Sequence, residues 1–219
     1  MGREQGDRWA IAGSMLNLSV IAQDRGDLGQ ATSFLEESLV LHRELGNKQG
    51  ISYCLVNLGM VAYSQGDLGR AAQLTEESVA LQRELGTRGG VALGLNNLGW
   101  IALLQDNLGR AADLYEESLT LAWDTGMNHI VQGDLEGFAC LAAVRGETER
   151  AARLWGAVQT LHETKGIPRD TDFLAEAGAR ISAVRSGMGE EAWEEAWRKG
   201  RAMTLDEAVS YALEEEAGA

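Results

Sequence analysis

Three pairs of adjacent glutamates come closest, by residue type and spacing, to a catalytic arrangement. The pairs are Glu36-Glu37, Glu76-Glu77 and Glu116-Glu117. Two neighbouring carboxyl groups can serve as general acid and general base when their surroundings separate their pKa values. These pairs recur at a fixed distance of 40 residues, whereas an active site needs one shaped pocket. We therefore interpret them as a solvated helix face.

Histidine and nucleotide-binding patterns are also weak. His162-Glu163 begins the H-E-x-x-H motif of zinc proteases, but Gly166 stands where the second histidine belongs. The sequence has no Gly-x-x-x-x-Gly-Lys and no Gly-x-Gly-x-x-Gly motif. A hydrolase is disfavoured because no nucleophile and base share an activating spacing. The sequence predicts a non-enzymatic protein with no catalytic residues, metal or cofactor.

Asparagine recurs in one phase, at Asn17, Asn57 and Asn97. An asparagine side chain offers both a donor and an acceptor. If these residues lie on neighbouring helices about 10 Å apart, the ladder matches about three residues of an extended peptide. The alternative is a structural hydrogen bond between helices, and the sequence leaves both open.

These residues recur because the chain repeats itself every 40 residues. Gly-Asp-Leu-Gly-Gln-Ala at 26–31 returns as Gly-Asp-Leu-Gly-Arg-Ala at 66–71, and in altered form at 106–111 and 146–151. A fixed period of this size is typical of a solenoid, in which each unit buries its apolar face against its neighbours. Each unit holds two amphipathic stretches joined by a turn of glycine and a capping aspartate, which predicts a helical hairpin.

The expected fold class is an all-α, right-handed solenoid with a C-terminal helical cap. First helices are predicted near 9–24, 48–65, 88–105 and 128–144, and second helices near 28–45, 68–85, 108–124 and 148–165. Beyond Pro168, helices near 171–186, 190–199 and 205–216 lack the repeat and should cap its last apolar face. Thr204 and Glu207 form a capping box for the last of these.

The same alignment gives the domain organisation. Residues 3–8 align with residues 43–48, which form the end of a second helix and the following turn. We therefore expect residues 1–8 to be the tail of a preceding repeat. We also expect the chain to be a fragment of a larger protein. Repeats follow at 9–46, 47–86, 87–126 and, in divergent form, 127–166, and capping helices occupy 167–219. Trp9 and Leu16 lie near an N-terminal face without a preceding hairpin, where exposed apolar area should either drive self-association or require a missing repeat to cover it.

Composition and charge argue against several classes of function. The 219 residues carry 33 Asp and Glu against 19 Lys and Arg, a formal charge of −14, without a basic cluster. Direct nucleic-acid contact is therefore not expected. No apolar run approaches a membrane span or a signal peptide. Cys54 and Cys140 lie two repeats apart, too far for a disulfide, and are interpreted as reduced, buried residues of a cytoplasmic protein.

Several residues resemble the tetratricopeptide signature, lengthened from 34 to 40 residues. They are Leu58-Gly59, Leu98-Gly99, Ala62, Ala102, Gly66, Ala71, Ala111 and Tyr115. Ser19, Asp106 and Phe138-Ala139 depart from it. The tail resembles the tetratricopeptide sensor region of large bacterial regulators of the LuxR-type, maltose-regulator-like family, which also carry an NTPase and a DNA-binding helix-turn-helix. The motifs concerned are 149–156, Glu191-Ala-Trp193, Ala196-Trp197, 200–203 and 205–208.

The resemblance places particular phases of the first helices in a concave groove. The expected ligand-binding residues are Asn17, Val20, Gln23, Tyr53, Asn57, Met60, Tyr63, Asn96, Asn97, Trp100 and Leu103, with Leu16 and Val56 beside them. Aromatic and methionine side chains suit an adaptable binding surface, although packing between repeats is the alternative. The expected function is a protein- or peptide-binding, signal-sensing module of a bacterial transcriptional regulator. The alternative is a receptor for a small-molecule inducer.

Overall fold

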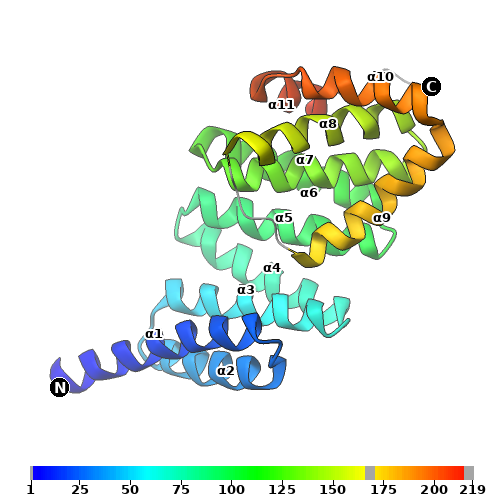
Figure 1. Ribbon diagram of the computed structural model, residues 1–219. Helices are drawn as coiled ribbons and strands as arrows, with labels where there is room; N and C mark the ends of the chain where they lie inside the picture. The colour runs from blue at the N-terminus through cyan, green and yellow to red at the C-terminus, as the bar shows by residue number, and fades with distance from the viewer. Residues whose placement is uncertain (1, 166–170, 215–219) are drawn as a thin grey trace. The chain divides into compact units, whose positions relative to one another are not determined.

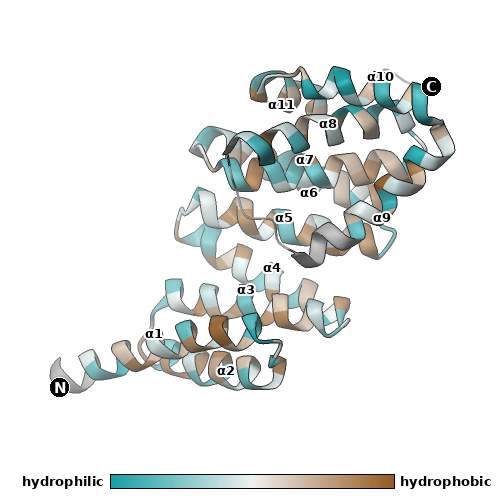
Figure 2. Cartoon of the chain, in the orientation of Figure 1, coloured by the Kyte–Doolittle hydropathy of each residue, from teal (hydrophilic) through white to brown (hydrophobic). Residues whose placement is uncertain are grey.

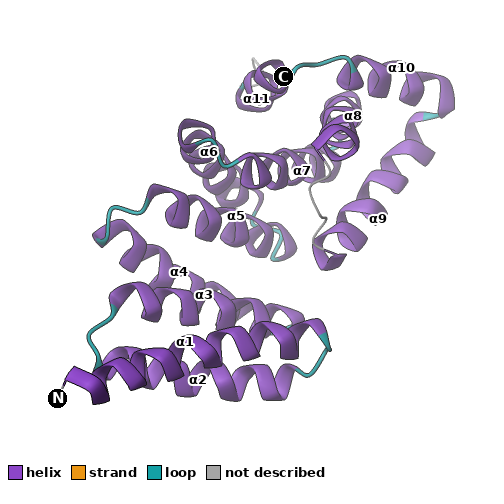
Figure 3. Cartoon of the chain, turned by 60° about the vertical axis from the view of Figure 1, so that its left-hand side comes forward, coloured by secondary structure: helices purple, strands orange, loops and turns teal. Residues whose placement is uncertain are grey.

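The computed structural model describes residues 2–165 and 171–214, and every regular element in them is an α-helix (Figures 1 and 3). The helices are α1 (Gly2–Asp24), α2 (Leu28–Glu44), α3 (Lys48–Ser64), α4 (Leu68–Glu84), α5 (Arg88–Leu104), α6 (Leu108–Thr125), α7 (Asn128–Arg145), α8 (Thr148–Lys165), α9 (Thr171–Met188), α10 (Glu190–Arg201) and α11 (Leu205–Leu213). The described ranges contain no strand, and the predicted all-α solenoid class is confirmed. Pro168 lies outside them.

The turns between helices follow the predicted chemistry. Four residues precede a helix and accept, through a side-chain oxygen, a hydrogen bond of 3.0–3.3 Å from the backbone N–H three residues later. They are Asp27, Asn47, Asp67 and Asn107. Gly66 has a φ of 80°, and Asp106, its counterpart one repeat later, has a φ of 57°. Aspartate tolerates this left-handed conformation better than most residues, so the turn keeps its shape without glycine.

The chain divides into two compact units, Met1–Ile101 and Ala102–Ala219, with the boundary inside α5. In the first unit, α1 packs on α2 and α3 on α4, and α3 also packs on α2. Leu35 and Leu39 of α2 and Leu55 of α3 belong to one buried cluster. Gly59 allows α3 and α4 to approach closely, because a Cβ there would lie 3.3 Å from the carbonyl oxygen of Ala71.

In the second unit, α7 and α8 form a hairpin to which the last three helices are added. α10 packs along α8, α9 packs on α7 and α8, and α11 contacts both α7 and α8. Gly156 and Gly200 allow the close approach of α8 and α10, because a Cβ on either would overlap a carbonyl oxygen of the facing helix. The predicted capping box of Thr204 and Glu207 is present at the start of α11.

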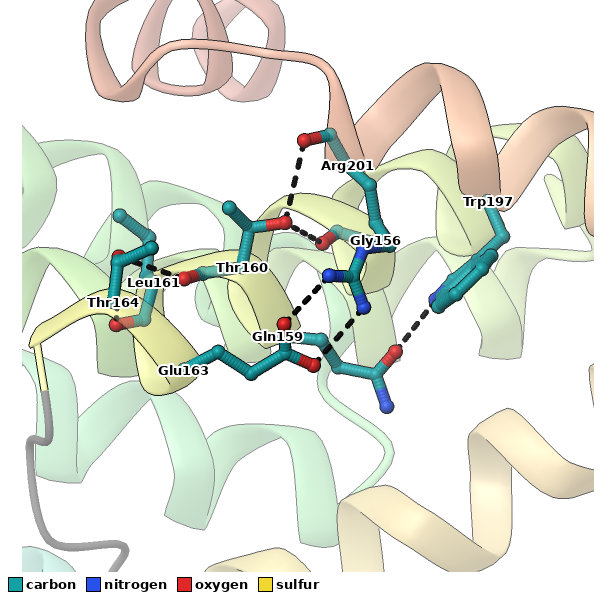
Figure 4. A network of polar contacts seen from close by, with 8 residues as sticks. All are labelled: Gly156, Gln159, Thr160, Leu161, Glu163, Thr164, Trp197 and Arg201. Carbon is teal, nitrogen blue, oxygen red and sulfur yellow. Dashed lines mark hydrogen bonds and ion pairs between the residues drawn. The ribbon is translucent and has the colours of Figure 1, made fainter.

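Polar contacts also hold α10 on α8 (Figure 4). The Trp197 indole N–H donates to Gln159 Oε1 at 2.5 Å. Arg201 donates to both carboxylate oxygens of Glu163, at 3.0 and 2.5 Å. The Thr160 hydroxyl donates to the carbonyl oxygen of Arg201 at 3.3 Å. These contacts hold the C-terminal half of α10 on α8, as expected for a helix that caps a repeat array.

The first helix differs from the prediction. α1 runs without interruption from Gly2, so the turn expected at Gly6-Asp7 is not seen. Residues 2–8 instead continue α1, and Arg8 forms an ion pair of 2.5 Å with Glu44 of α2, as Lys48 does with Glu84 one repeat later. The assignment of 1–8 to a preceding repeat stays a prediction.

Candidate ligand-binding face

The predicted site residues of α1 and α3 lie on one helix phase, which we call the A-helix face. On α1 it contains Leu16, Asn17, Val20 and Gln23, and on α3 it contains Tyr53, Val56, Asn57, Met60 and Tyr63. Val20 is 48% and Tyr53 is 50% exposed, so both side chains are accessible to a partner. Asn17 is exposed, and the remaining residues of the face are half-buried.

The corresponding residues of α5 are buried, and this corrects the prediction. Trp100 is 1% and Leu103 0% exposed, and Asn96 and Asn97 are 8% and 7% exposed. The physical reason is that α5 is apolar on all sides, and such a helix is covered on all sides. Among residues 91–103, only Leu93 is exposed. Trp100 is therefore a packing residue, and the accessible part of the predicted site lies on α1 and α3.

The asparagine ladder is not uniform. Asn57 Nδ2 donates to the backbone carbonyl oxygen of Tyr53, 2.7 Å away and one turn earlier on the same helix. Asn97 is buried, whereas Asn17 is exposed. Because the three amides have different surroundings, they do not offer a ligand three equivalent contacts, and the role predicted for the ladder is reduced to Asn17 and Asn57.

In the fourth hairpin, the face of α7 that is equivalent to the A-helix face is covered by another helix of the same chain, α9. Glu136 and Cys140 of α7 occupy the phases that Val56 and Met60 hold on α3. α9 packs on α7, and both the guanidinium of Arg180 and the carboxylate of Glu176 influence the Cys140 thiol electrostatically. Burial raises the pKa of this thiol to about 12. A helix of this chain therefore lies where a ligand of α7 would lie.

A buried polar cluster joins α7 to α8. His162 Nε2 lies 2.7 Å from Glu136 Oε1, and both side chains are 9% exposed. The Gln132 amide nitrogen lies 2.9 Å from the same ring nitrogen. This cluster was not predicted from the sequence, although polar residues recur 30 apart at the same repeat positions, and in the second hairpin Gln82 donates to Ser52. The recurring separation marks a polar link between the two helices of one hairpin.

A cavity of about 300 Å³ lies between α8, α9 and α10. Trp155, Trp193 and Trp197 contribute to its walls, together with the polar residues Gln159 and Glu194. The Arg185 guanidinium lies 5.8 Å from the centre of the Trp193 ring, a cation–π distance. The cavity is at the lower end of the size range of small-molecule sites.

Metal and thiol chemistry find no support in the described ranges. No three His, Cys, Asp or Glu side chains there are grouped as metal ligands, and His162 is paired with Glu136 instead. Cys54 and Cys140 are both buried and free, as predicted. None of the described helices is long and apolar enough to cross a membrane.

Comparison with known proteins identifies the repeat. A family model described as tetratricopeptide repeat matches residues 11–84 and, overlapping them, 55–122. The two matches together span more than half of the chain. This chain belongs to the tetratricopeptide-repeat family. Tetratricopeptide repeats generally mediate protein–protein interaction, and their fold is typically a non-enzymatic scaffold.

Solved structures support the tetratricopeptide fold. BtubC (BKLC) from P. vanneervenii is 18% identical, with 92% of this chain and 91% of that chain covered and a TM-score of 0.63. A putative kinesin light chain of Podosopora anserina with nearly identical TPR-like repeats is 16% identical, with coverage of 86% and 94% and a TM-score of 0.60. A single-substitution form of that kinesin light chain is 17% identical, with coverage of 86% and 92% and a TM-score of 0.61. No curated protein matches the sequence.

Proposed function

We propose that this tetratricopeptide-repeat protein binds a protein or peptide segment on the A-helix face of α1 and α3. The observation that carries the proposal is the exposure of Val20 and Tyr53, at 48% and 50%, beside half-buried Met60 and Tyr63. An aromatic ring with an apolar body and a polar tip suits an interface anchor. Met60 adds an adaptable side chain next to it.

The packing of α9 on α7 supports the same proposal. α7 is related to α3 by the repeat, and its equivalent phases are covered by a helix that presents Ala177, Ile181 and Val184 as buried residues. The face of a first helix at these repeat positions can therefore accept a packed polypeptide segment. On α1 and α3 the segment would come from a partner.

The experiment is a peptide selection followed by an affinity comparison. Peptides are selected from a displayed library on the wild-type protein, and their dissociation constants are then measured for Tyr53→Ala and Val40→Ala. Val40 is the matched control because it is 53% exposed but lies on α2. Tyr53→Ala should weaken binding about tenfold or more, and Val40→Ala should leave it within about twofold. Equal affinities for both variants would contradict the proposal.

The wider context is proposed from the tail motifs. Glu149–Gly156 and Gly200–Met203 support a role as the sensing region of a bacterial transcriptional regulator, acting in the cytoplasm beside an NTPase and a helix-turn-helix. The repeat boundaries at 46, 86, 126 and 166 belong to this proposal. Translation of the whole gene tests it, because a reading frame without either flanking domain would contradict it.

A second candidate function is the binding of a small-molecule inducer, favoured by the cavity between α8, α9 and α10. Its three tryptophans and convergent Gln159 and Glu194 have the mixed lining of ligand pockets. A ligand should raise the melting temperature of the wild type but not of Ser182→Trp, in which a large side chain fills the cavity from α9. An equal shift in both proteins would place the ligand elsewhere.

We also propose that the protein self-associates through the outer face of α1. Ile11, Leu18 and Ile21 lie on one side of this helix and are 47%, 43% and 45% exposed. Trp9 is 51% exposed but lies on the opposite side, where its ring packs edge-on against His42. Exposed apolar surface of this density marks an interaction site.

A further inference from the structure

Six residues of α1 and its C-terminal edge form a single stripe with helical spacing. They are Asp7, Ile11, Ser14, Leu18, Ile21 and Arg25, separated by four, three, four, three and four residues. Residues spaced in this way share one side of a helix. Ile11, Leu18 and Ile21 are 47%, 43% and 45% exposed, and Figure 2 shows brown, apolar segments along α1. Ala12 and Ser19, on another side of α1, are buried.

The equivalent residues of the later repeats show how this stripe packs. The counterparts of Leu18 and Ile21 on α3 are Leu58 and Val61, which are 5% and 2% exposed. Both belong to the cluster that contains Leu35 of α2, so on α3 this stripe packs against the second helix of the preceding hairpin. On α5 the counterparts Val91, Leu98 and Ile101 are also buried. The stripe on α1 is thus a helix-packing surface that no described element covers.

The ends of the stripe distinguish α1 from its counterparts. On α3 the end positions hold Asn47 and Gln65, and on α5 they hold Thr87 and Gln105, none of which is charged. On α1 they hold Asp7 and Arg25, which are both exposed. The stripe therefore has opposite charges at its two ends and apolar residues between them.

We infer that this stripe packs against the same stripe of a second copy, with the two α1 helices antiparallel. The pattern is symmetric about residue 16, so an antiparallel pair places Ile11 opposite Ile21 of the partner subunit and Ser14 opposite Leu18 of the partner subunit. It also places Asp7 opposite Arg25 of the partner subunit, twice by symmetry. A parallel pair would instead bring like charges together. The small Ser14 near the centre permits close approach of the helices. A two-fold dimer requires such a self-complementary surface.

The inference rests on the self-association proposed for α1 and is independent of the A-helix face. The interface is confined to one helix, so we expect a reversible dimer with a dissociation constant in the micromolar range. Charge complementarity across it should make the dimer weaker at high salt.

The first experiment is sedimentation equilibrium of the full 219-residue chain across about 1–200 µM. The wild type should pass from monomer to dimer, and Leu18→Asp should raise the dissociation constant at least tenfold by placing carboxylates in the interface. Val40→Asp is the control, since Val40 is a similarly exposed apolar residue on α2. Circular dichroism verifies that each variant is folded. A wild type that stays monomeric at every concentration, or a dimer unaffected by Leu18→Asp, would overturn self-association through α1.

The second experiment tests the antiparallel arrangement. At low salt, Asp7→Arg and Arg25→Asp should each weaken the dimer about tenfold, because each replaces two attractive pairs by two repulsive ones. The double variant should return within about threefold of the wild type. An equimolar mixture of the two single variants should also form a heterodimer. If the dimer forms but the double variant stays as weak as either single one, the antiparallel arrangement is overturned while self-association stands.

Discussion

Gln159 on α8 accepts a hydrogen bond of 2.5 Å from the indole N–H of Trp197 on α10. Trp197→Phe removes the donor and leaves the amide oxygen of a half-buried residue without it. We expect a loss of about 1–2 kcal/mol in the free energy of unfolding, measured by urea denaturation monitored by circular dichroism. The control is Trp123→Phe, which changes an indole on α6 that is 36% exposed and should cost less than about 0.5 kcal/mol. Equal losses would mean that the hydrogen bond does not stabilise the cap.

The crossing of α8 and α10 depends on Gly200. A Cβ at this position would overlap the carbonyl oxygen of Arg153, which belongs to the backbone and cannot rotate away. Gly200→Ala should therefore destabilise the protein by about 1–3 kcal/mol, whereas Gly178→Ala, with nothing within 4 Å of its Cβ, should stabilise α9 by about 0.5–1 kcal/mol. Thermal unfolding of the two variants should show melting temperatures that move in opposite directions. A stabilised Gly200→Ala would contradict the close packing of α10 on α8.

Cys140 should make stability fall at alkaline pH. Burial raises its pKa to about 12 in the folded protein from a reference value of 9.0. Between these values the unfolded chain releases the thiol proton and the folded chain keeps it, so rising pH favours unfolding. The contribution is present below about pH 9, and on the order of 1 kcal/mol of it is lost by pH 10. Urea denaturation from pH 8 to 10 should show a steeper decline for the wild type than for Cys140→Ala, and parallel curves would contradict the burial of this thiol.

Trp100 should behave as a core residue. Its side chain is 1% exposed, so Trp100→Ala should lower the free energy of unfolding by about 3–5 kcal/mol. Tyr53→Ala, at a position that is 50% exposed, should change it by less than about 0.5 kcal/mol. Chemical denaturation of the two variants compares them directly. A Trp100→Ala protein as stable as the wild type would restore Trp100 to the binding surface.

The helices could be predicted from the sequence because the signals that set them are local. Asp67 caps the start of α4, and Gly66 supplies the left-handed turn, so the boundaries follow from the repeat alone. Asp106 shows that the turn survives without glycine.

The accessible part of the site could not be predicted in the same way. Trp100 and Met60 hold equivalent positions in the 40-residue repeat, so the sequence placed both on one surface. The exposure of each side chain, however, depends on what packs over its helix. The packing of α9 on α7 is likewise invisible in the sequence, because α9 has no counterpart among the repeats. Equivalent positions in a repeat share a direction, but their burial differs with the surroundings of each helix: α5 is apolar on all sides, and α7 is packed against α9.

Methionine methyl NMR tests the binding of a polypeptide segment to α1 and α3 most directly. Met60 lies on the A-helix face, whereas Met188 is the last residue of α9 and Met203 lies between α10 and α11. Titration of a peptide selected on the wild-type protein into the methyl-labelled chain should shift or broaden the Met60 signal and leave those of Met188 and Met203 unchanged. The Met60 change should be lost when the same peptide is added to Tyr53→Ala at the same concentration. An unchanged Met60 signal together with shifts at Met188 or Met203 would contradict binding at the A-helix face.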